Sequence, residues 1–397
     1  MNFKFSTRTA DMNGTATREI FKLLSRPEIV SFAGGLPATE CLPVKEVREI
    51  TAEINSGDIV PVLQYGTTEG FPVLRHQLLE YLTGRGLPAI ADSNLMVVSG
   101  GQQGIDLMFK TFIDKGDVVL VEDPTYLAVL QILNTYEGKA VGVKSCEDGL
   151  DLEDLENKII QYKPKMLYCV PTFSNPTGRT YTTANRKEIA SLTARYGVMV
   201  LEDDPYSLLR FSGTAVPPLK SFDSAGNVVY VTSFSKIISP GLRVGAAVGD
   251  PSVIRYMTVG KQGTDLHTSN YAQMIVAKYL EKGYLMPNVE KSLPVYLERK
   301  SAMISAIEKY MPEEFSHTDP DGGLFIWGEL PETIDTVRLL PEAIERNVAY
   351  IQGQVFYADG SGRNTIRLNY SNAAPEQIES GIKALGELFK EKLAGRY

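Results

Sequence analysis

The sequence predicts an α/β protein whose larger domain is built on a mainly parallel sheet. From about Glu69 onward, amphipathic helical segments alternate with short apolar strands, which is the order that crossover connections produce. The predicted strands are apolar throughout, as expected for a sheet that is covered on both faces. They are Met96–Val98, Val118–Val121, Met166–Val170, Val198–Leu201 and Val228–Val231.

Helices and a second domain complete this prediction. Apolar residues at helical spacing predict a helix through Leu74 and Leu82, which Gly84 ends, and another through Ile105 and Phe112. After about residue 285, strands are predicted at 324–327 and 365–368, followed by a closing helix with Ile378 and Phe389 on one face. We therefore expect a large domain over residues 46–285, and a smaller domain formed by residues 1–45 and 286–397.

Composition excludes several classes of protein. A chain of 397 residues suits two domains, and a net charge of −8 argues against nucleic acid or an anionic membrane as a partner. The three cysteines are widely spaced, which favours reduced thiols in a cytoplasmic protein, and the three histidines are too scattered for a metal site. Neither a signal peptide nor a membrane span is predicted.

Four of the predicted strands run directly into polar residues. In chain order these are the glycine-rich turn Gly100-Gly101-Gln102, the amide Asn175, the carboxylate Asp203 and the amine Lys236. Taken singly, each has an ordinary explanation: a tight turn, a helix cap or a solvated lysine. Open parallel sheets bind ligands beyond the carboxyl ends of their strands, however, and here all four features fall at such ends. Their coincidence predicts a ligand site at this edge of the sheet.

On these residues the chain resembles the fold type I pyridoxal-phosphate-dependent aminotransferases of class I/II. Within the family it is most similar to the branch that contains the 2-aminoadipate and kynurenine aminotransferases, and the resemblance covers nearly the whole chain. The segments that carry it are 31–37 (SFAGGLP), 64–66 (QYG), 174–178 (SNPTG), 203–206 (DDPY), 233–236 (SFSK), 240–243 (PGLR) and 366–368 (IRL). The resemblance implies a large domain with a mainly parallel, seven-stranded sheet, a smaller α+β domain, and pyridoxal 5′-phosphate as cofactor.

The resemblance also implies roles around the cofactor ring. Lys236 would carry the cofactor as a Schiff base and then move the proton of the substrate. Asp203 would pair with the pyridine nitrogen and keep it protonated, which makes the ring an electron sink. Asn175 and Tyr206 would hydrogen-bond the phenolic oxygen of the ring, and Tyr126 would stack on its face.

For the phosphate, the resemblance implies a cup of hydrogen-bond donors and positive charge. Its members would be the turn Gly100-Gly101-Gln102, the hydroxyls of Ser233 and Ser235, the guanidinium of Arg243 and, from a neighbouring subunit, Tyr65. Many relatives have a serine or threonine where this chain has Gly101, so only the backbone amide remains at this position. The role of Tyr65 implies a homodimer.

For the substrate, Arg367 matches the family arginine that binds the α-carboxylate through a bidentate fork. The amide of Gly35 and the side chain of Asn175 would assist it. Arg18 aligns with an arginine that binds a distal carboxylate in aminoadipate-type relatives; the alternative is a surface residue on an N-terminal helix.

The function implied is the exchange of an amino group between an L-α-amino acid (2-aminoadipate, aromatic or branched-chain) and an α-keto acid such as 2-oxoglutarate. A carbon–sulfur β-lyase on the same scaffold is the alternative, because it would use the same lysine, acid and arginine. A non-enzymatic regulator that binds pyridoxal phosphate is disfavoured. The resemblance begins within the first thirty-odd residues, which leaves no room ahead of it for a DNA-binding domain.

Overall fold

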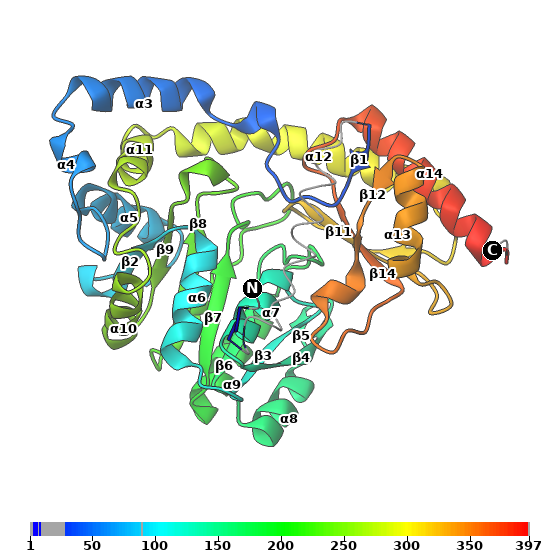
Figure 1. Cartoon of the computed structure of the whole chain (residues 1–397), viewed down its shortest axis with the longest axis horizontal. Helices are drawn as coiled ribbons and strands as arrows, with labels where there is room; N and C mark the ends of the chain where they lie inside the picture. The colour runs from blue at the N-terminus through cyan, green and yellow to red at the C-terminus, as the bar shows by residue number, and fades with distance from the viewer. Residues whose placement is uncertain (1–2, 7, 9–27, 89, 396–397) are drawn as a thin grey trace.

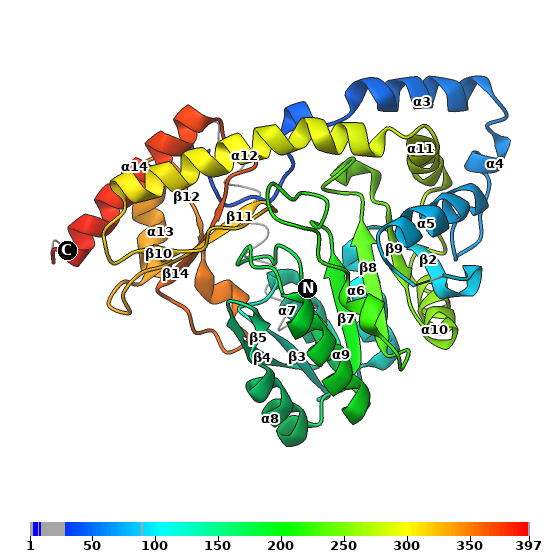
Figure 2. The ribbon, with the colours of Figure 1, turned by 180° about the vertical axis from the view of Figure 1, so that it is seen from behind.

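The computed structural model describes residues 3–6, 8, 28–88 and 90–395. Within them the chain forms a large central sheet and, to one side, a smaller sheet with its own helices (Figure 1). The long helix α12 (Leu285–Tyr310) lies along one side of both sheets and packs against α14 (Pro375–Leu393), as both views show (Figure 2). The domain boundaries given above stay a prediction.

The large sheet has eight strands in the described part of the chain. In spatial order these are β2 (Leu95–Val98), β9 (Gly245–Val248), β8 (Val228–Ser233), β7 (Met199–Asp204), β6 (Met166–Cys169), β3 (Val118–Asp123), β4 (Lys139–Cys146) and β5 (Gly149–Leu150). Only β9 and β5 run antiparallel to their neighbours. The mainly parallel sheet is therefore confirmed. Seven strands of four residues or more match the expected number, and the two-residue β5 adds an eighth at the edge.

Helices cover both faces of this sheet, as the apolar strands predicted. Alternate strand residues enter two separate apolar clusters: Val121 and Val231 pack in one, whereas Leu120 and Val200 pack in the other. The first cluster includes residues of α6 (Gly101–Phe112), and the second includes residues of α8 (Leu152–Tyr162) and α9 (Thr183–Tyr196). Accordingly, α6 lies in front of the sheet in Figure 1 and α9 lies in front of it in Figure 2.

Three strands, β3, β7 and β8, continue beyond the apolar runs that predicted them, and this places polar residues inside the sheet. The pairing of β7 with β8 continues through Asp203↔Val231 and Asp204↔Thr232. Asp203 and Asp204 are thus strand residues, and because successive side chains point to opposite faces, the two carboxylates face opposite sides of the sheet.

The remaining helices surround the two sheets. They are α3 (Val44–Ser56), α4 (Val60–Leu63), α5 (Pro72–Gly84), α7 (Leu127–Thr135), α10 (Pro251–Gln262), α11 (Asn270–Glu281) and α13 (Thr336–Glu345). Local sequence explains several ends: Thr182 caps α9 by accepting a hydrogen bond from the amide of Asn185, and Gly197 ends that helix with a left-handed φ of 66°. Within the described residues, no helix is both long and apolar enough to cross a membrane.

The smaller sheet is antiparallel, with the order β10 (Ser316–His317), β11 (Phe325–Glu329), β14 (Thr365–Asn369) and β13 (Ile351–Gln352). Beside it, β1 (Val30–Ser31) pairs in parallel with β12 (Val348–Ala349). This pairing brings the segment around residue 30 next to the C-terminal part of the chain, where the carbonyl oxygens of Phe32 and Ala33 accept hydrogen bonds from Asn369 and Arg367 of β14.

A glycine allows α6 to lie directly on the sheet. A Cβ atom at Gly104 would lie 2.7 Å from Cγ1 of Val231 in β8, which is closer than side-chain atoms approach. The helix can therefore pack with its backbone close to β8, and its N-terminus ends beside the carboxyl end of that strand.

Candidate active site

A cavity of about 410 Å³ lies where the carboxyl ends of β7 and β8 meet the N-terminus of α6. The residues predicted from the sequence that line it are Gly35, Gly101, Gln102, Tyr126, Asn175, Asp203, Tyr206, Ser233, Ser235, Lys236, Arg243 and Arg367. The structure therefore brings together residues from both sheets and from the segment after β1.

Lys236 projects into this cavity from the turn that follows β8. Its Nζ donates a hydrogen bond of 2.6 Å to the carbonyl oxygen of Gly35. Burial lowers the pKa of Lys236 to about 8, and the positive charges of Arg367 and Arg243 act in the same direction. An amine with this pKa is partly unprotonated near neutral pH, as a nucleophilic amine must be.

Asp203 is the carboxylate on the cavity side of β7. Its Oδ2 accepts a hydrogen bond of 2.9 Å from the hydroxyl of Tyr168. Burial raises the pKa of Asp203 to about 7, opposed by that hydrogen bond and assisted by the charge of Asp204. Asp204, on the other face, accepts hydrogen bonds from the hydroxyls of Tyr230 (2.7 Å) and Ser207 (2.6 Å). These contacts give Asp204 a structural role.

Tyr168 was missed by the sequence analysis because it lies within the apolar run of β6. The parallel register could have revealed it: Tyr168 pairs with Leu201, which places it on the same face as Asp203 two residues further along β7. The apolar pattern predicted the strand, but not which of its side chains would meet the carboxylate.

Arg367 lies on β14 of the smaller sheet, and its buried side chain points into the cavity at the edge of the large sheet. Its guanidinium donates to Oδ1 of Asn175 (2.8 Å) and to the carbonyl oxygen of Ala33 (2.6 Å), and it lies over the rings of Phe325 and Phe356. Among the described residues, its Nε–H has no hydrogen-bond partner. Burial lowers the pKa of Arg367 to about 10, so the group stays charged. A buried cation with an unpaired donor is suited to bind an anion.

The end of the cavity at α6 collects a second set of donors. Gly100 has a φ of 84° and precedes the helix, and a Cβ there would lie 2.4 Å from the guanidinium of Arg243. Glycine therefore lets Arg243 lie against the helix start. The Ser233 hydroxyl contacts that of Ser235 at 2.8 Å, and Arg243 contacts the Ser235 hydroxyl at 3.4 Å. At Gly101, by contrast, a side chain would meet nothing nearer than 3.6 Å, so space does not explain this glycine.

Two tyrosines complete the wall. Burial raises the pKa of Tyr126 to about 12 and raises that of Tyr206 further, so both hydroxyls stay protonated and can donate hydrogen bonds. Tyr206 also packs edge-on against Phe325, with ring centroids 5.9 Å apart.

Two predicted residues in the described part of the chain do not line the cavity. Gly100 lies one residue outside it, at the cap of α6. Tyr65 is 79% exposed and contacts the ring of His267, and the side chain of Asn270 donates to the carbonyl oxygen of the preceding residue, Gln64. Arg18 lies outside the described residues.

The donor set fits pyridoxal phosphate. The described lining residues include three cations (Lys236, Arg243 and Arg367) but a single carboxylate, Asp203. Such an excess of partly desolvated positive charge calls for anionic groups, and a phosphate at the start of α6 with a substrate carboxylate at Arg367 would supply them. Asp203 would then be available to the one cationic group of the cofactor, its protonated ring nitrogen. The described residues contain no cluster of His, Cys, Asp or Glu suited to a metal ion.

Comparison with known proteins agrees with this geometry. The family model for aminotransferase class I and II matches residues 28–385. Aromatic-amino-acid aminotransferase 1 of Thermococcus litoralis is 40% identical over 394 residues, covering 98% of this chain and 94% of that protein. The structure of Pyrococcus horikoshii kynurenine aminotransferase in complex with PMP has a TM-score of 0.94 at 41% identity, covering 98% of this chain and 97% of that one. The Thermus thermophilus α-aminoadipate aminotransferase complexed with N-(5′-phosphopyridoxyl)-L-leucine has a TM-score of 0.92 at 35% identity, covering 98% of each chain.

The chain therefore belongs to the class I and II aminotransferase family, with the type I fold. It is an aminotransferase that depends on pyridoxal phosphate.

The raised pKa of Asp203 should make the cofactor-free protein less stable as the pH rises. The folded protein keeps this proton up to about pH 7, whereas the unfolded chain keeps it only to about pH 4. The folded state binds more protons in this window, so the free energy of unfolding falls with rising pH, by at most about 1.4 kcal/mol per pH unit for one group. We expect Asp203→Asn to flatten this slope in urea unfolding of the cofactor-free protein.

The variant should keep a residual slope, because burial also raises the pKa of Glu122 to about 8 and that of Glu202 to about 7. Tyr168→Phe should extend the window to higher pH, since it removes a hydrogen bond that lowers the pKa of Asp203. A wild-type slope in Asp203→Asn would contradict the assignment.

Proposed function

We propose that this enzyme transfers the amino group of an L-α-amino acid to an α-keto acid such as 2-oxoglutarate, with 2-aminoadipate, aromatic or branched-chain amino acids as donors. The names of similar enzymes, which include aromatic-amino-acid, kynurenine and α-aminoadipate aminotransferases, support this range. The single observation that carries the proposal is the pairing of Lys236 and Arg367 in one cavity. An amine that reacts at Cα and a cation that holds the α-carboxylate define an α-amino acid site.

Arg367 would hold the substrate. Two of its donors are already fixed by Asn175 and by the carbonyl oxygen of Ala33, so the guanidinium cannot rotate freely. The unpartnered Nε–H and the remaining capacity of the fork are then available to a carboxylate. Two aromatic rings, Phe325 and Phe356, support the guanidinium and exclude water around it.

Lys236 would bind the cofactor and later move the proton. Pyridoxal phosphate, when bound, supplies an aldehyde that amines attack and a cationic ring that withdraws electrons from the substrate's Cα. With cofactor and substrate bound, the Nζ of Lys236 would accept the proton from the substrate's Cα. Its lowered pKa suits this base role near neutral pH.

The other lining residues would fix the ring. The carboxylate of Asp203, oriented by Tyr168, would accept from the ring nitrogen. Asn175 and Tyr206 would donate to the phenolic oxygen, and Tyr126 would stack on the ring face. The helix start at Gly101, together with Ser233, Ser235 and Arg243, would bind the phosphate.

We include a cytoplasmic homodimer in this proposal. Tyr65 stands outside its own cavity, and it is flanked by two further exposed apolar side chains: Val60 is 66% exposed and Leu63 is 70% exposed. A second copy that covers this surface would bury these side chains. Tyr65 would then reach the phosphate of the neighbouring active site.

The proposal is tested by incubating the holoenzyme with single amino acids, with and without 2-oxoglutarate. We expect glutamate to form only when both a bulky donor and the keto acid are present, in a ping-pong rate pattern. Lys236→Ala should abolish turnover, because neither the cofactor attachment nor the proton transfer has a substitute. Release of pyruvate and ammonia from a cysteine derivative without any keto acid would instead identify a carbon–sulfur lyase.

Arg18 is proposed to bind the distal carboxylate of acidic substrates. Arg18→Ala should therefore raise the KM for glutamate and 2-aminoadipate about tenfold or more, as expected for loss of a charge-assisted pair. Leucine and phenylalanine, which lack that carboxylate, serve as control substrates and should be unaffected. Equal losses for acidic and apolar donors would refute the assignment.

A further inference from the structure

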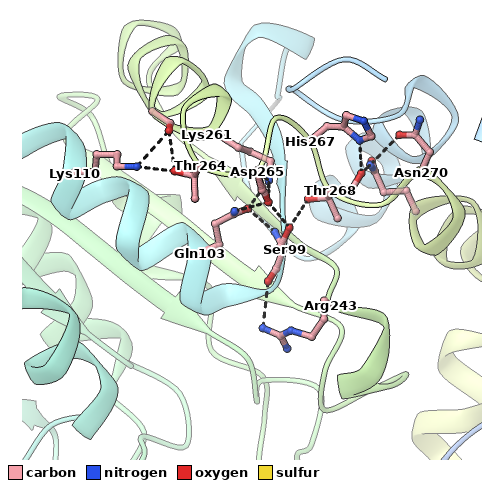
Figure 3. Close-up of polar contacts among 12 residues, drawn as sticks. Ser99, Gln103, Lys110, Arg243, Lys261, Thr264, Asp265, His267, Thr268 and Asn270 are labelled. Carbon is pink, nitrogen blue, oxygen red and sulfur yellow. Dashed lines mark hydrogen bonds and ion pairs between the residues drawn. The ribbon is translucent and has the colours of Figure 1, made fainter. Parts of the chain in front are cut away.

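The segment 261–269, which comprises the last two residues of α10 and the loop that leads to α11, lies against the first turn of α6 (Figure 3). Its first residue, Lys261, has a fully buried side chain. The ammonium group donates to Oε1 of Gln103. It also donates to the two carboxylate oxygens of Asp265, and each of these two bonds is 2.9 Å long. All three of its N–H bonds can thus be satisfied within the protein.

Asp265 extends this contact to the residue that precedes the helix. Its Oδ2 accepts from the hydroxyl of Ser99 at 2.9 Å and from Nε2 of Gln103 at 2.7 Å. The backbone amide of Ser99 in turn donates to Oε1 of Gln103 at 2.7 Å. These four residues form a closed ring of hydrogen bonds, drawn together in Figure 3.

This ring fixes both sides of the turn that begins α6. Ser99 precedes Gly100 and Gly101, and Gln103 follows Gln102, so the amides of residues 101 and 102 lie between two anchored positions. The carbonyl oxygen of Ser99 also accepts a hydrogen bond of 3.1 Å from the guanidinium of Arg243. The ring therefore contacts both parts of the donor set at this end of the cavity: the turn that begins α6 and the guanidinium of Arg243.

Stability alone is a poor reason for this arrangement. Burial lowers the pKa of Lys261, opposed by its bonds to Asp265, so the charge is kept at a cost in desolvation. Replacing a buried ion pair by well-packed apolar residues is often neutral or stabilising. What apolar residues could not do is orient the polar groups of Ser99 and Gln103.

We propose that Lys261 and Asp265 are positioning residues for the cofactor's phosphate: through Ser99 and Gln103 they hold the α6 amides and Arg243 in the orientation that binds it. The inference rests on the proposed function of Gly101 and Arg243 as phosphate ligands.

The test compares pyridoxal phosphate with pyridoxal, which lacks the phosphate, in absorbance titrations of the full-length protein freed of cofactor. In Lys261→Met, the affinity for pyridoxal phosphate should fall about tenfold, the loss expected for a misaligned hydrogen bond to a charged group. The affinity for pyridoxal should stay unchanged, so the ratio of the two dissociation constants changes. A general loss of folding would lower both affinities together and leave this ratio constant.

Lys110→Met is the matched control. Lys110 of α6 donates a 2.6 Å hydrogen bond to Thr264 in the same segment 261–269, but none of the hydrogen bonds drawn for it reaches Ser99 or Gln103 (Figure 3). Its replacement should leave the ratio as in the wild type. Asp265→Asn, which keeps the size of the side chain, provides a second variant if Lys261→Met does not fold.

Arg243→Ala separates the two levels of the proposal. If it changes the ratio and both ring variants do not, the positioning role is wrong and the phosphate site stands. If Arg243→Ala itself leaves the ratio unchanged, the phosphate site is wrong and the positioning role falls with it.

Discussion

The main physical constraint on this structure is the charge of its cavity, which is lined by three cationic side chains and a single carboxylate. Burial lowers the pKa of Lys236 to about 8 and that of Arg367 to about 10, and the positive charges of Arg367 and Arg243 lower the pKa of Lys236 further. Folding alone gains nothing from such an arrangement, because desolvated charges cost free energy unless they are paired. Anionic ligands would supply the missing partners: we propose a phosphate at α6 and a carboxylate at Arg367. The same excess of positive charge helps to lower the pKa of Lys236, so part of its amine is unprotonated and can react near neutral pH.

The parallel sheet is what makes this convergence possible. Strands β7 and β8 end at the same edge, so Asp203 and Lys236, which are 33 positions apart in sequence, line one cavity. The continuation of β7 through Asp204 then separates the two neighbouring carboxylates: one faces the cofactor site, and the other is bound by the hydroxyls of Tyr230 and Ser207. Because β1 pairs with β12, the carbonyl oxygen of Ala33 is in position to fix Arg367.

Much of this was predictable from the sequence, because apolar strands and the polar residues that end them are local signals. The mainly parallel sheet, the strands that lead to Asp203 and Lys236, and the edge where they meet all follow from such patterns. The contacts that orient these groups are not local. Tyr168 reads as one more apolar strand residue, and Lys261 as an ordinary helix-end lysine, because the contacts of Tyr168 with Asp203 and of Lys261 with Gln103 form only through tertiary packing. For Tyr65 the local sequence indicates a role that is not found in the cavity of its own chain, because the tyrosine is proposed to act in the neighbouring subunit.

The central claim is that Lys236 carries the cofactor, and covalent trapping tests it most directly. Borohydride reduces a Schiff base to a stable amine, so the reduced holoenzyme can be digested and its peptides mapped by mass spectrometry. We predict a phosphopyridoxyl group on the peptide that contains Lys236, and its absence when a donor amino acid is added before reduction. The same group on another lysine, or no labelled peptide from protein that binds the cofactor, would contradict the assignment.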